Sequence, residues 1–117
     1  MSGALFSQTT TAAGLLFISG QVPVDVAGTF VGGDITRQAN AVFDRLADHL
    51  AERGLSLNDL VKISYFLTDI SMLQDFRSVI LTRLAQPRPA STLVEVSALI
   101  NPDYLVEIEA IADAGLR

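Results

Sequence analysis

The chain has 117 residues, half of them hydrophobic, and a formal net charge of −5 at pH 7. This length suits one domain spanning residues 1–117, and the acidic balance argues against non-specific nucleic-acid binding, which needs a basic surface. Cysteine is absent and His49 is the only histidine. Disulfides, thiolate nucleophiles and a cysteine-ligated zinc site are therefore excluded, and we expect neither a metal ion nor another cofactor.

The apolar composition points to self-association. The mean hydropathy of +0.41 is high for so short a chain, and a small domain built on one sheet has too little interior to bury that much apolar surface. No apolar run approaches the roughly 20 residues that span a bilayer. The first residues, Met1–Leu5, lack the basic and apolar regions of a signal peptide. We therefore expect a cytoplasmic oligomer without a membrane segment.

The first half of the chain predicts strands followed by a long helix. Leu15–Gly20 is a compact apolar run closed by glycine, which is typical of a strand covered on both faces. The glycines around Val22–Val26 and Thr29–Val31 favour a hairpin-like return. Apolar residues then recur at steps of three and four between Asp34, which suits an N-cap, and Gly54, which suits a helix end. This pattern predicts a helix of about five turns.

The second half predicts one more helix among three strands. Val61–Leu67 is rich in β-branched and aromatic residues, as strands are. Ser71 and Gln74 fit a capping box at the start of a shorter helix, which the following prolines end. Strands are expected at Thr92–Ala98 and Tyr104–Ala112. The order predicts an α+β fold with a single sheet and two helices on one face, whose other face a symmetric neighbour would cover.

Short blocks spread along the chain together resemble the Rid/YjgF family, once described as endoribonuclease L-PSP or translation inhibitors. Their order and spacing carry the resemblance, which runs from about Phe6 to Ala112. It implies a chorismate-mutase-like fold and a homotrimer with clefts between neighbouring subunits. The blocks are Phe6–Gln8, Phe17–Pro23, Val31–Ile35, Val61–Lys62, Phe66–Asp69, Val94–Val96 and Val106–Ala112.

The resemblance also implies a chemistry. Well-studied members of the family hydrolyse reactive enamines and imines, such as 2-aminoacrylate and 2-iminopropanoate, to keto acids and ammonia. Such a site must hold the substrate carboxylate, favour the protonated imine and position one water molecule. By similarity, Glu109 orients that water, while Phe6, Ser19 and Gly20 line the cleft. Without the resemblance, the residues favour reading Glu109 as an ordinary strand carboxylate that faces solvent or a partner subunit.

One position departs from the family in a way that bears on function. The family places an arginine before its Val-Glu-Val strand, where a bidentate pair can hold the substrate carboxylate. Ser91 occupies that position here and supplies only a neutral hydrogen bond. Arg77, where the family often has asparagine, or Arg88, three residues upstream of Ser91, is a candidate replacement. Both also fit solvated surface charges, Arg77 on an amphipathic helix and Arg88 between two prolines.

Two classes of function follow from the resemblance and from this departure. The first is a deaminase or related hydrolase that acts on a small enamine, imine or related metabolite and has diverged from 2-iminopropanoate deaminases. The second is a Rid-like protein that binds a small carboxylate at the same interfaces without catalysing a reaction. The lost arginine favours the second class and divergent enzymes. The orientation of Arg77 and Arg88 relative to the cleft distinguishes the two.

Overall fold

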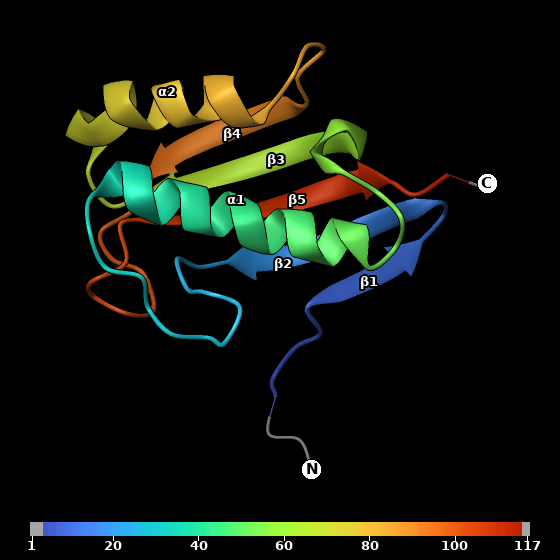
Figure 1. Cartoon of the computed structure of the whole chain (residues 1–117), viewed down its shortest axis with the longest axis horizontal. Helices are drawn as coiled ribbons and strands as arrows, with labels where there is room; N and C mark the ends of the chain where they lie inside the picture. The colour runs from blue at the N-terminus through green and yellow to red at the C-terminus, as the bar shows by residue number, and fades with distance from the viewer. Residues whose placement is uncertain (1–3, 116–117) are drawn as a thin grey trace.

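The computed structural model of the protein describes residues 4–115 and has two layers, a sheet and a pair of helices (Figure 1). The sheet has five strands in the order β1-β2-β5-β3-β4, and only β3 and β4 run parallel. The helices α1 (Ile35–Ala51) and α2 (Leu73–Arg83) lie on the same face of the sheet (Figure 1). The strands are β1 (Thr9–Ala12), β2 (Leu15–Gln21), β3 (Leu60–Leu67), β4 (Ala90–Glu95) and β5 (Val106–Asp113). The predicted α+β architecture is confirmed.

The core lies between this sheet and the two helices. Alternate residues of the central strands, such as Ile63 of β3 and Ile108 of β5, are fully buried there. They pack in one cluster with the apolar stripe of α1, which includes Phe43 and Leu46. Because successive strand residues point to opposite faces, the residues between them face away from the helices. We call that uncovered side of the sheet the open face.

Local signals at both ends fix the long helix. The Asp34 carboxylate accepts a hydrogen bond from the backbone N–H of Arg37 at 3.0 Å, as an N-cap does. After the helix ends at Ala51, Gly54 takes a positive φ of 70° that a side chain would disfavour. The predicted helix and its predicted N-cap are therefore confirmed.

The predicted start of the second helix is wrong. Ser71 is not an N-cap, because its own backbone N–H donates to the Asp69 carboxylate at 2.9 Å and caps a 3-10 turn instead. The helix α2 begins after that turn, and its N-cap residue, Met72, makes no side-chain capping bond. The sequence Ser71 to Gln74 matches the motif only in spacing. A capping box is instead formed by Ser56 and its partner Asp59, just before β3.

Three strand predictions are corrected as well. Thr9–Ala12 forms an edge strand, β1, that the sequence did not indicate because it is polar and mostly exposed. Instead of the predicted hairpin between residues 22 and 31, the structure has a single β-bridge between Val24 and Phe30. The strand expected to run to Ala98 ends at Glu95, where its parallel partner β3 also ends. Pairing between strands, rather than local composition, sets these limits.

The edge of β2 brings the N-terminal segment into the site region. The strand β1 pairs with only the first part of β2, from Leu15 to Ile18. Beyond it, the preceding segment continues along β2, where the Ser19 N–H donates to the Gln8 carbonyl at 2.9 Å. The Ser19 hydroxyl also donates to the Ser7 carbonyl at 2.7 Å. These bonds hold Phe6 next to the end of β2. Within residues 4–115, no helix is both long enough and apolar enough to cross a membrane.

Candidate functional site

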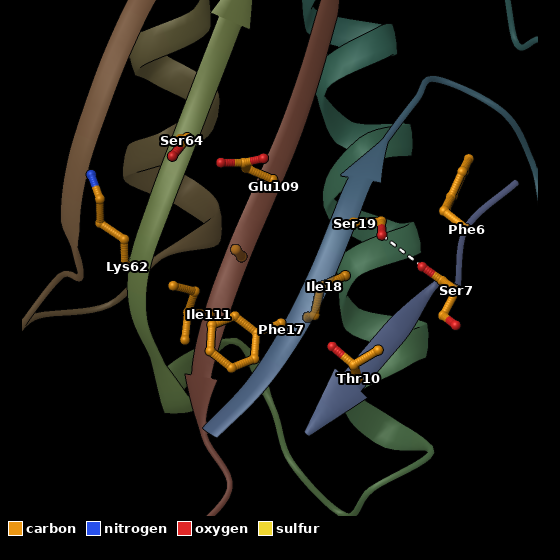
Figure 2. Close-up of a pocket in the computed structure, with 11 residues that line it drawn as sticks. Phe6, Ser7, Thr10, Phe17, Ile18, Ser19, Lys62, Ser64, Glu109 and Ile111 are labelled. Atoms are coloured by element: carbon orange, nitrogen blue, oxygen red, sulfur yellow. Dashed lines mark hydrogen bonds between the residues drawn. The ribbon is translucent and has the colours of Figure 1, made fainter. Parts of the chain in front are cut away.

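A pocket of about 510 Å³ lies on the open face of the sheet and gathers polar side chains from several strands (Figure 2). Ser19 comes from β2, Lys62 and Ser64 from β3, and Glu109 from β5, while Phe6 comes from the N-terminal segment. The pocket thus contains a cation, a carboxylate and hydroxyl groups within a mostly apolar surround. Phe6, Ser19 and Glu109, three of the residues predicted from the family resemblance, line it together.

Strand register explains why these polar groups meet. Ser64 lies directly opposite Glu109 on the neighbouring strand, and Thr92 lies opposite Ser64 on its other side. Lys62 is two residues before Ser64 and so points to the same face. Its Nζ donates to the Thr92 hydroxyl at 2.8 Å. In Figure 2, the Ser64 side chain lies between the Lys62 ammonium and the Glu109 carboxylate.

The Glu109 carboxylate is available for chemistry. The residue is exposed, and within residues 4–115 the carboxylate forms neither a hydrogen bond nor an ion pair. Phe17 and Ile111 supply an apolar wall beside it (Figure 2). A carboxylate in this setting can accept a proton from a water molecule or pair with a cationic nitrogen. The arrangement therefore suits a small polar ligand better than an apolar one.

Gly20, predicted as a cleft residue, lines an adjoining pocket of about 530 Å³ together with Phe6, Glu107 and Arg45. The Glu107 carboxylate lies where a Cβ on residue 20 would be, so glycine is required for this close approach. Burial raises the pKa of Glu107, and the negative charge of Glu109 raises it further. The two carboxylates are two residues apart on one strand face, which makes their charges mutually unfavourable.

The guanidinium of Arg45 is an unpredicted feature of this second pocket. Its Nη2 pairs with the Asp48 carboxylate at 2.9 Å. Its Nε and Nη1 are buried and have no hydrogen-bond partner among the described residues. Unpaired buried donors are costly, and water commonly satisfies them. Arg45 therefore adds a positive charge beside Gly20 and Glu107, at one end of the site region.

The structure does not bring Ser91 to the pocket within one protomer. Ser91 lies opposite Ile63 on β3, and Ile63 is fully buried under the helices. Because residues directly opposite share a face, Ser91 is on the helix-covered side, whereas Glu109 is on the open face. The two can meet only across a subunit boundary. The expectation of one cleft built from more than one subunit therefore stays a prediction.

Neither candidate replacement for the arginine lines either pocket with Phe6. Arg77 is exposed on α2, which covers the opposite face of the sheet (Figure 1). The Nε of Arg88 donates to the Leu84 carbonyl at 3.1 Å. Arg88 also lies near Tyr65, where burial raises the tyrosine pKa to about 12 and the arginine charge opposes that shift. Within one protomer, both arginines therefore lie on the side of the sheet that the helices cover.

Sequence reasoning missed Lys62 and Ser64. The signal was present, because both alternate with buried residues in the strand Leu60–Leu67. What the sequence did not give was the register that sets Ser64 opposite Glu109. A metal centre finds no support in this part of the chain, since residues 4–115 hold no group of three histidine or acidic side chains that could bind an ion.

Comparisons with known proteins agree with this fold. The family model described as endoribonuclease L-PSP matches residues 2–114. A RutC family protein of Pyrococcus horikoshii is 39% identical over 108 residues, which cover 92% of this chain and 85% of that protein. Protein MMF1, mitochondrial, of Saccharomyces cerevisiae is 32% identical over 111 residues, covering 94% and 77% of the two chains.

Solved structures give the same result. The crystal structure of RidA from an Antarctic Psychrobacter species has a TM-score of 0.88 and 32% identity, and the match covers 97% of this chain and 91% of that one. For the crystal structure of yeast Mmf1, the TM-score is 0.90 with 32% identity, covering 96% and 89%. With a family model that spans nearly its whole length and relatives of the same fold, the chain belongs to the Rid/YjgF family of endoribonuclease L-PSP-like proteins.

Proposed function

We propose that this protein hydrolyses a small reactive imine or enamine to a keto compound and ammonia, in clefts between the subunits of a homotrimer. The observation that carries the proposal is the exposed Glu109 carboxylate, which faces a pocket with hydroxyl groups and has no partner among the described residues. Glu109 also occupies the position to which the family resemblance assigns the water-orienting carboxylate. Family membership supports the class of reaction but does not name the substrate.

The reaction asks Glu109 to move protons in both halves of the hydrolysis. As a water oxygen attacks the carbon of the protonated imine, the carboxylate takes a proton from that water, and the C=N electron pair moves to nitrogen. Glu109 then passes this proton to the nitrogen of the carbinolamine. As the C–N bond breaks and ammonia leaves, the carboxylate accepts the carbinol O–H proton, so that the carbinol oxygen becomes the keto oxygen; the proton is then released to ammonia or solvent. The Ser64 hydroxyl, which lies opposite Glu109 in the same pocket, would hydrogen-bond to the water or to the carbinol oxygen.

A trimer is proposed because the open face exposes large apolar side chains that a neighbouring subunit would cover. Phe6 is 60% exposed, Val94 41% and Phe17 37%, and all three lie at the site or on the open-face strands. Exposed large apolar side chains gathered on one face are typical of an interaction site. Light scattering should give three times the protomer mass of 12.5 kDa. A stable monomer at micromolar concentration would contradict the assembly.

Turnover of freshly generated 2-iminopropanoate tests the function. We expect ammonia and pyruvate to form faster than without protein, and the Glu109→Gln variant to lose about 100-fold or more of that rate, because it cannot accept the proton. Glu52→Gln, on an exposed residue at the end of α1, is the matched control and should keep the wild-type rate. Equal rates in wild type and Glu109→Gln would contradict the assigned role.

The alternative is a protein that binds a small carboxylate without converting it. The absence of an arginine from the open-face pocket favours this alternative, since only Lys62 supplies positive charge there within the described residues. Saturable binding of pyruvate together with no ammonia release from any imine tried would establish it. The name of the family model refers to RNA cleavage, which we do not extend to this chain. Its net charge of −5 opposes RNA binding, and the pocket holds no histidine among the described residues.

Location is a separate proposal. We propose the cytoplasm for this chain, in keeping with the sequence expectation. Among the relatives, the yeast protein MMF1 is described as mitochondrial, so family membership alone does not decide the compartment.

A further inference from the structure

Gln21 is one of two polar residues that are buried among the described residues, the other being Gln38. It is the last residue of β2 and lies opposite Ile108, which is fully buried under the helices. Because residues directly opposite share a face, the Gln21 side chain is on the helix-covered side of the sheet. A buried amide needs hydrogen-bond partners at both its nitrogen and its oxygen. The partners of Gln21 connect three parts of the chain.

The side-chain nitrogen of Gln21 joins β2 to the N-terminal segment. It donates to the Ser19 carbonyl and to the Gln8 Oε1, both at 2.9 Å. Ser19 itself is bonded to that segment, through its hydroxyl to the Ser7 carbonyl (Figure 2) and through its N–H to the Gln8 carbonyl. Phe6 comes just before these residues, is 60% exposed and lines both pockets. The place of its ring therefore depends on these bonds rather than on burial.

These bonds fall where β2 departs from regular pairing. The register of β2 against β5 shifts between Ile18 and Gln21. Such a bulge bends a strand, changes the direction of its side chains and interrupts the hydrogen bonds between the strands. Ser19 and Gly20, two of the cleft residues expected from the sequence, lie in this irregular stretch. The bond from Gln21 to the Ser19 carbonyl therefore supports the backbone of the bulge from the helix side.

His49 of α1 fixes the orientation of the Gln21 amide. The Ser19 carbonyl can only accept a hydrogen bond, so it faces the amide nitrogen, and the Gln21 oxygen faces the imidazole. The Nε2 of His49 is 3.2 Å from that oxygen. This assigns a hydrogen to Nε2, which donates to Gln21. One buried side chain thus connects α1, β2 and the N-terminal segment.

We propose that Gln21 is a positioning residue of the site. Its amide, oriented by His49, holds the Ser19 backbone and the segment that carries Phe6 in the geometry that shapes the two pockets. Gln21 acts through these residues and not on the reacting atoms of a ligand. The inference rests on the proposed function only for its effect on turnover, because the effect on the backbone can be measured separately.

Amide hydrogen exchange measured by NMR tests this positioning without relying on turnover. In wild type the Ser19 N–H, which donates to the Gln8 carbonyl, should be protected. Gln21→Met keeps the length of the side chain but removes the amide. It should speed Ser19 exchange about tenfold relative to the amides at the centre of α1, since two hydrogen bonds are lost. His49→Phe should have a smaller effect in the same direction, and His49→Gln, whose Nε2 can still donate, should restore protection.

Gln38 provides the matched control. It is also buried, but its side chain bonds to the backbones of Gly33 and Leu105, in the loops before α1 and β5. Gln38→Met should therefore destabilise the protein without a selective change at Ser19. Gln8→Ala alters an exposed residue, so it carries little risk to folding. It removes one partner of Gln21 and should speed Ser19 exchange about threefold.

Steady-state kinetics separate positioning from catalysis. With 2-iminopropanoate, Gln21→Met should raise KM about tenfold and change kcat by less than about threefold, because the pocket wall moves while Glu109 remains. Unchanged Ser19 exchange in both Gln21→Met and Gln8→Ala, or an equal change in Gln38→Met, would overturn the inference. So would a fall in kcat at constant KM. A wild-type protein without turnover would refute only the proposed function, since the exchange of Ser19 does not depend on it.

Discussion

The ionised form of Glu107 opposes folding at neutral pH. Its side chain lies over Gly20, half-buried and near the charge of Glu109, and burial and that charge raise its pKa. In the unfolded chain the same carboxyl has a pKa near 4.5. A raised folded-state pKa stabilises the protein fully below the unfolded value, and this stabilisation is lost as pH rises through the folded value.

We therefore expect Glu107→Gln to unfold at a higher temperature than wild type at pH 7 and at nearly the same temperature at pH 4. The neutral amide keeps the shape of the side chain and removes the unfavourable charge. Thermal unfolding monitored by circular dichroism across this pH range measures the effect. Glu52→Gln, on an exposed glutamate, should change little at either pH. A lower unfolding temperature of Glu107→Gln at pH 7 would show that the charge is instead stabilised by a contact between subunits.

At the scale of single residues, the sequence proposes side chains of suitable chemistry but does not determine where they lie. Phe6, Ser19 and Glu109 line one pocket of the protomer. Gly20 lines the adjoining pocket, where its lack of a side chain makes room for Glu107. Within one protomer Ser91 and Glu109 lie on opposite faces of the sheet, so their meeting in one cleft between subunits stays a prediction. A shift of one residue in the pairing of two strands moves a side chain to the other face of the sheet, and the local sequence does not determine this pairing.

At the scale of elements, the helix α1 was predictable because its determinants are local. Its apolar spacing and its N-cap, Asp34, lie within the segment that forms it. The strand β1 was not predictable, since its mostly exposed residues Thr9–Ala12 are held only by pairing with β2. The predicted capping box at Ser71 is wrong for a different, local reason, because the Asp69 carboxylate accepts the hydrogen bond from the Ser71 N–H. Spacing alone does not reveal such competition.

The different roles of Asp34 and Ser71 at the starts of the helices can be tested by substitution. Asp34→Ala removes a side chain that accepts a hydrogen bond from the Arg37 N–H, and it should lower the free energy of unfolding by about 1 kcal/mol. Ser71→Ala is the control, because the backbone N–H that Asp69 binds is kept. Its effect should stay below about 0.5 kcal/mol. Urea denaturation of both variants measures the difference. A larger loss in Ser71→Ala than in Asp34→Ala would reverse our assignment of the caps.

At the scale of the whole molecule, the two faces of the sheet have different roles. The helices bury one face, and the other carries Lys62, Ser64 and Glu109 among exposed apolar residues. Ser91 belongs to the edge strand β4, on the helix-covered side of that strand. In the proposed trimer, the edge of one subunit would approach the open face of the next. An arginine at position 91 could then reach only the Glu109 of a neighbour.

Mixed trimers test this geometry directly. We expect Ser91→Arg to raise turnover of 2-iminopropanoate by about ten- to 100-fold, since it adds a charge-assisted pair worth about 1.5–3 kcal/mol. The double variant Ser91→Arg with Glu109→Gln should be inactive alone, because it has the guanidinium but no proton acceptor.

Co-assembled with wild type, the double variant should yield trimers more active than either parent. In such trimers, the new guanidinium of one subunit faces the intact Glu109 of the next. The control is a mixture of wild type with Glu109→Gln alone, which dilutes active clefts without adding an arginine and should fall below wild type. If the arginine acted on Glu109 within its own subunit, the first mixture would show no gain, and the site would have to be assigned to a single protomer.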